Sequence, residues 1–179
     1  MLDAAKAILV IVDVQGKLAQ LMHDRESLFA NLQRMASGAK TLGIPILWNE
    51  QNPLGLGATI PELAEILTGQ QPLVKNTFSC CGNPAFAEKI KASGRRQVLL
   101  VGIETHVCVY QTAQDLLGQG FQVEVVADAV SSRTEANRRL GLERMKALGA
   151  GITSTEMALF ELLRVAEGDK FKAILKSVK

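Results

Sequence analysis

The stretch from Gln97 to Leu117 changes its hydrophobic period once, and this change limits the possible fold more than any other feature of the 179-residue sequence. Its first part, Val98–Ile103, is a continuous apolar run rich in β-branched residues, which is typical of a strand buried on both faces. From Val107 to Leu117, apolar residues recur at helical spacing. A buried strand that leads directly into a helix predicts a parallel sheet covered by helices.

Strand-like and helix-like segments alternate six times along the chain. The predicted strands are Ala7–Val12, Ile44–Trp48, Pro72–Lys75, Val98–Ile103, Gln122–Ala127 and a short strand near Ile152. The predicted helices are Arg25–Leu42, Pro61–Leu67, Ala85–Ala92, Val107–Leu117, Glu135–Leu148, Thr155–Val165 and Asp169–Val178. Because the connections are too short for a second domain, residues 1–179 are expected to form a single domain. The expected α/β fold is a three-layer α/β/α sandwich with a six-stranded, mainly parallel, Rossmann-like sheet of order 3-2-1-4-5-6.

Composition argues against several classes of protein. Hydrophobic residues make up 47% and charged residues 21%, as in ordinary soluble globular proteins. The net charge is only +2 and the basic residues are scattered, so no nucleic-acid partner is expected. No apolar run approaches the roughly 20 residues of a membrane span. The three cysteines, two of them adjacent, form no disulfide framework, so a reducing cytoplasm is the expected location.

Polar or reactive residues stand at the carboxyl ends of four predicted strands: Asp13, Glu50, Lys75 and, just past the fourth, Cys108. In a parallel sheet these ends lie at one edge, where distant residues can meet. A carboxylate can take a thiol proton, and a lysine can hold the thiolate. The start of the following helix is expected to lower the pKa of Cys108 and to offer backbone N–H groups as an oxyanion hole. Taken singly, Asp13 could cap a loop, Lys75 could be solvated and Cys108 could fill core.

Three segments carry a resemblance to a known family. They are LVIVDVQ with Asp13, VKNTFS with Lys75, and GIETHVCV with Cys108. Together they resemble the isochorismatase-like cysteine hydrolases, a superfamily that includes nicotinamidases and N-carbamoylsarcosine amidase. The segments NEQNPLGLGATIPEL, VGIETHVCVYQTAQDLL and VADAVSSR are similar to the isochorismatase-domain-containing proteins of bacteria and animals, a branch whose substrate is poorly defined.

The resemblance implies a role for each matched residue. Asp13 is expected to be the general base and acid, Lys75 the residue that orients and stabilises, and Cys108 the nucleophile. The implied oxyanion hole consists of the backbone N–H groups of Glu104 and Cys108, preceded by a cis peptide at Ile103–Glu104. The implied reaction is attack of Cys108 on a carbonyl or imine-like carbon, expulsion of ammonia or an amine, and hydrolysis of the thioester by water.

The sequence also departs from known members of that superfamily. Zinc-dependent nicotinamidases carry histidines after the second strand, whereas the only histidines here are His23 and His106. We therefore expect no metal, no cofactor and no nicotinamidase activity. True isochorismatases hydrolyse a vinyl ether and lack the nucleophilic cysteine, so the presence of Cys108 argues against that reaction. Glu104 stands where a small residue is common, and it either contacts the substrate or pairs with a lysine or arginine.

Other features bear on the substrate and on assembly. Trp48 and Phe78 are candidates for lining a substrate pocket, although a tryptophan at a strand end is also typical of core. Specificity is expected in the irregular loops Asn52–Thr59 and Asn76–Asn83. The expected partner is a small-molecule substrate, with no nucleic acid and no membrane, and the chain is expected to form a homo-oligomer, either a dimer or a larger assembly.

Two other interpretations remain open. One is a scaffold or binding protein that has kept the fold and lost turnover. The other is a redox sensor in which Cys108 reacts with peroxide and Cys80 or Cys81 resolves the product. A Rossmann-type nucleotide site is not expected, because the first strand leads into DVQGK rather than into a glycine-rich phosphate loop.

Overall fold

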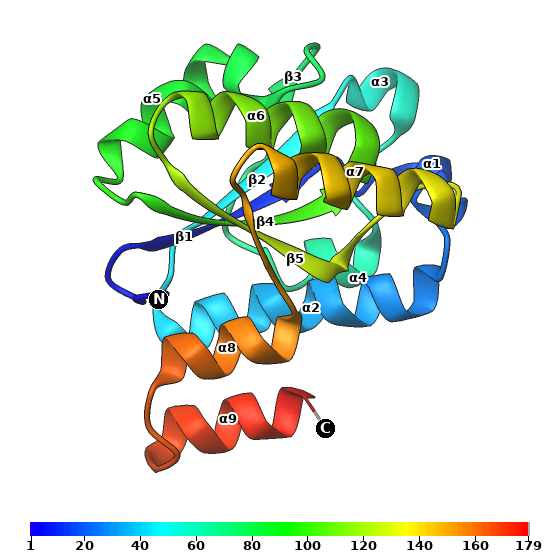
Figure 1. The fold of residues 1–179 in the computed structure, drawn as a ribbon. Helices are drawn as coiled ribbons and strands as arrows, with labels where there is room; N and C mark the ends of the chain where they lie inside the picture. Colours follow the sequence, from blue (N-terminus) through cyan, green and yellow to red (C-terminus); the bar gives the residue numbers. More distant parts are fainter. Residues whose placement is uncertain (179) are drawn as a thin grey trace.

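The computed structural model describes residues 1–178 and arranges them as a central sheet between two layers of helices (Figure 1). The sheet has the order β3-β2-β1-β4-β5-β6, and every neighbouring pair is parallel. The strands are β1 (Ala7–Val12), β2 (Ile46–Gln51), β3 (Leu73–Lys75), β4 (Gln97–Ile103), β5 (Gln122–Ser131) and β6 (Gly151–Thr153). The predicted sandwich and strand order are confirmed.

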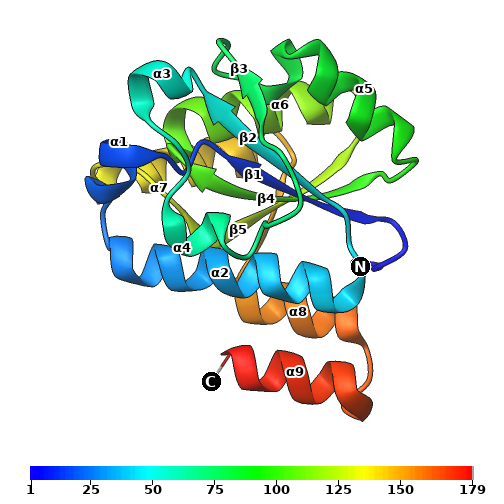
Figure 2. The ribbon, with the colours of Figure 1, turned by 180° about the vertical axis from the view of Figure 1, so that it is seen from behind.

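Helices cover both faces of this sheet. They are α1 (Gly16–Gln20), α2 (Arg25–Leu42), α3 (Pro53–Leu56), α4 (Pro61–Ala64), α5 (Pro84–Ala92), α6 (Tyr110–Gly118), α7 (Glu135–Ala147), α8 (Thr155–Leu163) and α9 (Gly168–Val178). Helices α5, α6 and α7 lie on one face, whereas α2 and α8 lie on the other with α9 outside them (Figures 1 and 2). Along residues 1–178, no helix combines the length and hydropathy needed to cross a membrane.

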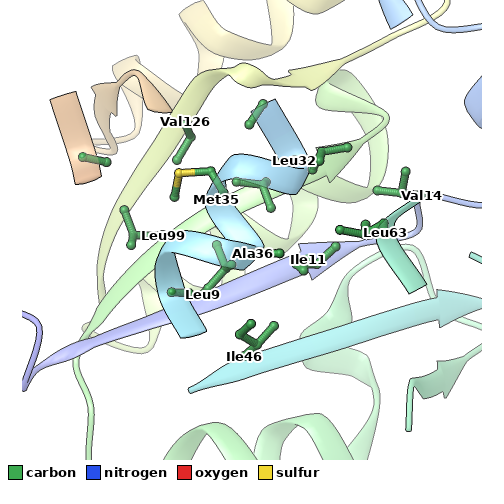
Figure 3. Close-up of a cluster of buried hydrophobic side chains, with 14 of the residues drawn as sticks. Leu9, Ile11, Val14, Leu32, Met35, Ala36, Ile46, Leu63, Leu99 and Val126 are labelled. Atoms are coloured by element: carbon green, nitrogen blue, oxygen red, sulfur yellow. The ribbon is translucent and has the colours of Figure 1, made fainter. Parts of the chain in front are cut away.

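Each face of the sheet has its own hydrophobic core. Leu9 and Ile11 of β1 pack with Leu32 and Met35 of α2 (Figure 3). The β1 residues that alternate with Leu9 and Ile11 pack on the other face of the sheet, with Phe86 of α5 and with Cys108. This division follows from the alternation of side chains along a strand. Every side chain of β1 and β4 is buried, as expected for the two central strands of a parallel sheet.

Two strands differ from the sequence-based expectation by more than one residue. Strand β2 ends at Gln51 rather than Trp48, so the polar residues after the tryptophan belong to the sheet. Strand β5 continues past Asp128 to Ser131, because its pairing with β4 shifts register between Leu100 and Gly102 and then resumes. Asp128 therefore lies within the strand, where its Oδ1 accepts hydrogen bonds from the backbone N–H and the hydroxyl of Thr155 at 2.8 and 2.9 Å.

Gly102 brings the two central strands into unusually close approach. Its φ is +117°, and a Cβ atom at this position would lie 2.1 Å from the carbonyl oxygen of Val12. Only glycine combines that conformation with that space. Since Val12 precedes Asp13 and Gly102 precedes Ile103, this contact sets the positions of both strand ends.

Candidate active site

Asp13 and Lys75 form a buried ion pair at the carboxyl edge of the sheet. Asp13 directly follows β1 and Lys75 ends β3, so the two side chains reach across the end of β2. Asp13 Oδ2 lies 2.6 Å from Lys75 Nζ, and the side chains are only 2% and 0% exposed. Lys75 Nζ also donates to the carbonyl oxygens of Thr77 and Phe78, both at 2.9 Å. The three ammonium protons are thus directed at three close acceptors, and the lysine is not solvated.

Cys108 lies opposite this pair, in a π-helical turn that joins β4 to α6. The turn spans Thr105–Val109, and the peptide bond just before it, Ile103–Glu104, is cis. The N–H groups of Val107 and Val109 both donate to the carbonyl of Glu104. The Cys108 side chain is buried, and its Sγ lies 3.3 Å from Gln51 Oε1.

The surroundings of Cys108 favour the neutral thiol. Burial raises the pKa of this thiol above its ordinary value, and the Asp13 carboxylate raises it further, while the Lys75 ammonium opposes both. The sequence-based expectation was a lowered pKa at the helix start, whereas burial and the Asp13 carboxylate raise it. Burial also raises the pKa of Asp13, and Lys75 opposes that shift. The resting arrangement is a protonated thiol beside a carboxylate that can take its proton.

This electrostatic arrangement predicts slow alkylation at neutral pH. Only the thiolate reacts, and a raised pKa leaves less thiolate at any given pH. We expect iodoacetamide to label Cys108 slowly at pH 7, with a rate that rises only above the ordinary thiol pKa of about 8.5. Mass spectrometry after digestion measures this rate, and the half-buried Cys81, whose pKa is raised to about 11, serves as an internal comparison. Rapid labelling of Cys108 below pH 8 would contradict the expectation.

Gln51 belongs to the site, although the sequence did not single it out. Its Oε1 lies near both Cys108 Sγ and, at 3.4 Å, Lys75 Nζ. Its backbone is fixed by Gln15, which is fully buried two residues after Asp13. Gln15 accepts the N–H of Gln51 at 2.7 Å and donates to its carbonyl at 3.1 Å. The available signal was a polar residue just past a predicted strand, and the misplaced end of β2 concealed it.

Glu104 is engaged by an arginine. Its Oε1 accepts hydrogen bonds from the backbone N–H and the Nε of Arg133, at 3.2 and 3.1 Å. The Glu104 side chain is 10% exposed, against 56% for Arg133. Of the two expectations for Glu104, pairing with a basic residue is the one that the structure shows.

The structure does not bring Trp48 to the thiol. Trp48 packs in the core on the α2 face, opposite the face that holds Cys108. Its indole N–H donates to Thr59 Oγ1, which in turn donates to a carboxylate oxygen of Glu50, each at 2.7 Å. The expected substrate contact from Trp48 is therefore corrected to a core position, and Glu50 serves to hold the loop that contains Thr59.

Phe78 and Cys80 lie beside the ion pair. The Phe78 side chain is half exposed, while its carbonyl helps to hold Lys75. Cys80 is fully buried, and burial raises the pKa of its thiol to about 12.

Within the part of the chain that the structure describes, no three His, Cys, Asp or Glu side chains are grouped so that they could hold a metal ion.

Comparisons with known proteins agree on one family. The isochorismatase domain family model matches residues 7–157. Isochorismatase domain-containing protein 1 of Danio rerio is 38% identical over 179 residues, which cover 99% of this chain but 62% of the zebrafish protein. Isochorismatase domain-containing protein 2 of Bos taurus is 38% identical over 174 residues, which cover 97% of this chain and 83% of the bovine protein.

Solved structures show the same similarity in three dimensions. The MAR1 ribonuclease of Caenorhabditis elegans has a TM-score of 0.92 at 36% identity, covering 99% of this chain and 91% of that chain. YcaC of Pseudomonas aeruginosa, solved with hexane-2,5-diol and covalent acrylamide, has a TM-score of 0.92 at 30% identity, with coverages of 98% and 90%. YcaC of Escherichia coli, described as an octameric hydrolase of unknown specificity, has a TM-score of 0.93 at 25% identity, with coverages of 98% and 89%.

Proposed function

Because the chain belongs to the isochorismatase family, we propose that it is a cofactor-independent hydrolase that uses Cys108 to attack a small amide or a related C–N substrate. One observation carries the proposal. Asp13 Oδ2 is bound to Lys75, whereas Oδ1 is buried and, within residues 1–178, has no hydrogen-bond partner. The carboxylate that raises the pKa of Cys108 therefore keeps one oxygen available for the thiol proton.

The proposed reaction passes through a thioester. Cys108 Sγ forms a bond to the substrate carbonyl carbon while its proton moves to Asp13, and the backbone N–H groups of Glu104 and Cys108 stabilise the oxyanion. Asp13 then gives this proton to the departing nitrogen as the C–N bond breaks. In the second half, Asp13 takes a proton from water, the resulting hydroxyl attacks the thioester, and Cys108 leaves and regains its proton. Lys75 keeps the carboxylate of Asp13 in place throughout.

The burial of the site favours a small substrate. Asp13, Lys75 and Cys108 are each less than a tenth exposed. This geometry fits a small amide better than a polymer, although the C. elegans relative is described as a ribonuclease. The relative from P. aeruginosa, solved with covalent acrylamide, supports access by a small primary amide.

The decisive experiment measures ammonia release from a panel of small primary amides. We expect at least one amide to be hydrolysed by the wild-type protein and none by Cys108→Ala, with both proteins equally folded by circular dichroism. Acrylamide treatment at pH 8.5, followed by digestion and mass spectrometry, is expected to place an adduct on Cys108. Amide hydrolysis retained in Cys108→Ala would refute the mechanism. A folded wild-type protein with no hydrolysis and no adduct would instead support a scaffold or binding protein.

The redox alternative is less compatible with the thiols. Sensor cysteines react as thiolates and have low pKa values. Here burial raises the pKa of Cys108, Cys80 and Cys81 alike. Peroxide consumption with disulfide formation would nevertheless identify such a sensor directly.

The pH dependence of turnover tests the role of Asp13. The base form is required, and burial raises the pKa of Asp13 above its ordinary value of 3.8. A raised pKa means that the carboxylate is protonated at a higher pH than usual, so kcat/KM should fall with decreasing pH while ordinary carboxyl groups are still ionised. A stopped assay of ammonia release from pH 4 to pH 9 measures this. A kcat/KM that stays constant down to pH 4 would contradict the proposed environment.

We also propose that the chain acts as a homo-oligomer on a small molecule in the cytoplasm, without nucleic acid or membrane partners. The octameric relative from E. coli supports the assembly, and the three free cysteines fit a reducing compartment. Light scattering coupled to size-exclusion chromatography measures the oligomeric state, and a monomer at micromolar concentration would contradict it.

A further inference from the structure

The carboxamide of Gln51 is turned so that its oxygen faces the nucleophile. Its neighbours on this side are the thiol of Cys108 at 3.3 Å and the ammonium of Lys75 at 3.4 Å. An ammonium can only donate, and a protonated thiol donates here, so only the carboxamide oxygen fits between them. The orientation therefore follows from the chemistry of the two neighbours.

The thiol is the main donor to this oxygen. Lys75 Nζ already has Asp13, Thr77 and Phe78 as acceptors at 2.9 Å or less, so its contact with Gln51 is the weakest of its four. When Cys108 gives its proton to Asp13, Gln51 Oε1 loses its principal donor. At that moment the oxygen of this half-buried carboxamide lies beside the carbon under attack, and its remaining donor is Lys75 Nζ at 3.4 Å.

We propose that Gln51 is a specificity residue that recognises an N–H group of the leaving nitrogen. As the thiol proton departs, Gln51 Oε1 accepts a hydrogen bond from the substrate NH₂. No covalent bond of Gln51 forms or breaks. An ester has no such proton and leaves the oxygen with only its long contact to Lys75, so the site selects primary amides over esters of the same size. This inference rests on the proposed function and names its substrate class.

Gln15 is the positioning residue for this contact. Its carboxamide pairs with both backbone groups of Gln51, as a neighbouring strand would, and its Nε2 also donates to the carbonyl of Gly57 at 2.7 Å. The end of β2 is thereby fixed at the distance from Cys108 that the contact requires. Gln51 can therefore be replaced without losing the backbone hydrogen bonds that hold its strand.

The test compares chloroacetamide with methyl chloroacetate as probes of Cys108. In each reaction Sγ forms a bond to the CH₂ carbon, chloride leaves, and the thiol proton is lost to base. The probes differ in that one carries NH₂ and the other OCH₃ on the carbonyl. Rates are measured by mass spectrometry at pH 8.5, and each amide-to-ester ratio is divided by the ratio for N-acetylcysteine. We expect a corrected ratio well above one for the wild type and a roughly tenfold drop in Gln51→Ala, the size of one hydrogen bond.

Two further variants separate recognition from structure. Gln51→Glu retains an acceptor oxygen, so it should keep the corrected ratio even where the added charge slows both reactions. Gln71→Ala removes an exposed glutamine of the loop before β3 and should match the wild type. An unchanged ratio in Gln51→Ala, or an equal loss in Gln51→Glu, overturns the inference. Loss of all labelling at Cys108 in the wild type would instead count against the proposed nucleophile.

Discussion

Replacing Asp13 by asparagine is expected to reduce amide hydrolysis by about 10³-fold while making Cys108 more reactive toward iodoacetamide. The two effects have one cause. Asp13 accepts the thiol proton during catalysis, and its charge also raises the pKa of Cys108. Asparagine removes both influences and leaves the Lys75 ammonium, which lowers the pKa of the thiol, without its opposing charge. More thiolate forms, but the proton for the leaving nitrogen is lost.

The measurements are ammonia release and the rate of iodoacetamide labelling of Cys108 at pH 8, on the same preparations. Asp169→Asn, an exposed site on α9 with the same change of charge, is the matched control and should leave both rates unchanged. Removal of one partner of a buried ion pair typically costs about 3–5 kcal/mol of stability, so labelling is compared at a temperature where both proteins are folded. Slower labelling in Asp13→Asn would contradict the arrangement of charges described here.

Replacing Gly102 by alanine is expected to destabilise the fold severely. The added Cβ would lie 2.1, 2.7 and 2.8 Å from the carbonyl oxygen, nitrogen and carbonyl carbon of Val12, at a φ of +117°. These atoms are backbone of a central strand, so they cannot move aside as a flexible side chain can. β1 and β4 are both fully buried, and their separation would disrupt both hydrophobic cores. We expect a loss of more than about 4 kcal/mol in the free energy of unfolding.

Urea unfolding followed by circular dichroism measures this loss, and low soluble yield would accompany it. Gly118→Ala is the control, because a Cβ there meets no atom within 4 Å and alanine favours the helical conformation. That variant should be as stable as the wild type or slightly more stable. A Gly102→Ala protein within 1 kcal/mol of the wild type would show that the central strands tolerate separation.

The elements with simple patterns could be predicted from the sequence. β1 and α2 have the predicted bounds, because an uninterrupted apolar run defines the strand and Gly43 ends the helix in a left-handed conformation. β2 was placed wrongly because its last residues are polar. Hydrogen bonds from Thr59 hold Glu50 in the sheet, and hydrogen bonds with Gln15 hold Gln51. Partners so distant in the chain leave no local signal.

Some features of the candidate site could be predicted from the sequence and others could not. Strand ends and strand order place Asp13 beside Lys75, since only β2 separates their strands. The pKa of Cys108 could not be read from its place at a helix start, because its direction depends on burial by surrounding elements. The departure from the family pattern at Glu104 left both a substrate contact and a basic partner open, and the partner, Arg133, lies in the loop after β5, where no local signal marks it. The catalytic roles themselves remain predictions for the experiments above.

Lys75 of the ion pair belongs to β3, a short strand at one edge of the sheet. β3 has three residues, it pairs only with β2, and the Val74 side chain in its middle is half exposed. Peripheral segments of this kind open far more often than the whole protein unfolds. Such an opening would move the Lys75 ammonium away from Asp13 and break the ion pair, while both hydrophobic cores stay intact. We therefore expect opening of β3 to limit the lifetime of the Asp13–Lys75 pair, and amide hydrogen exchange at β3 measures that opening independently of global stability.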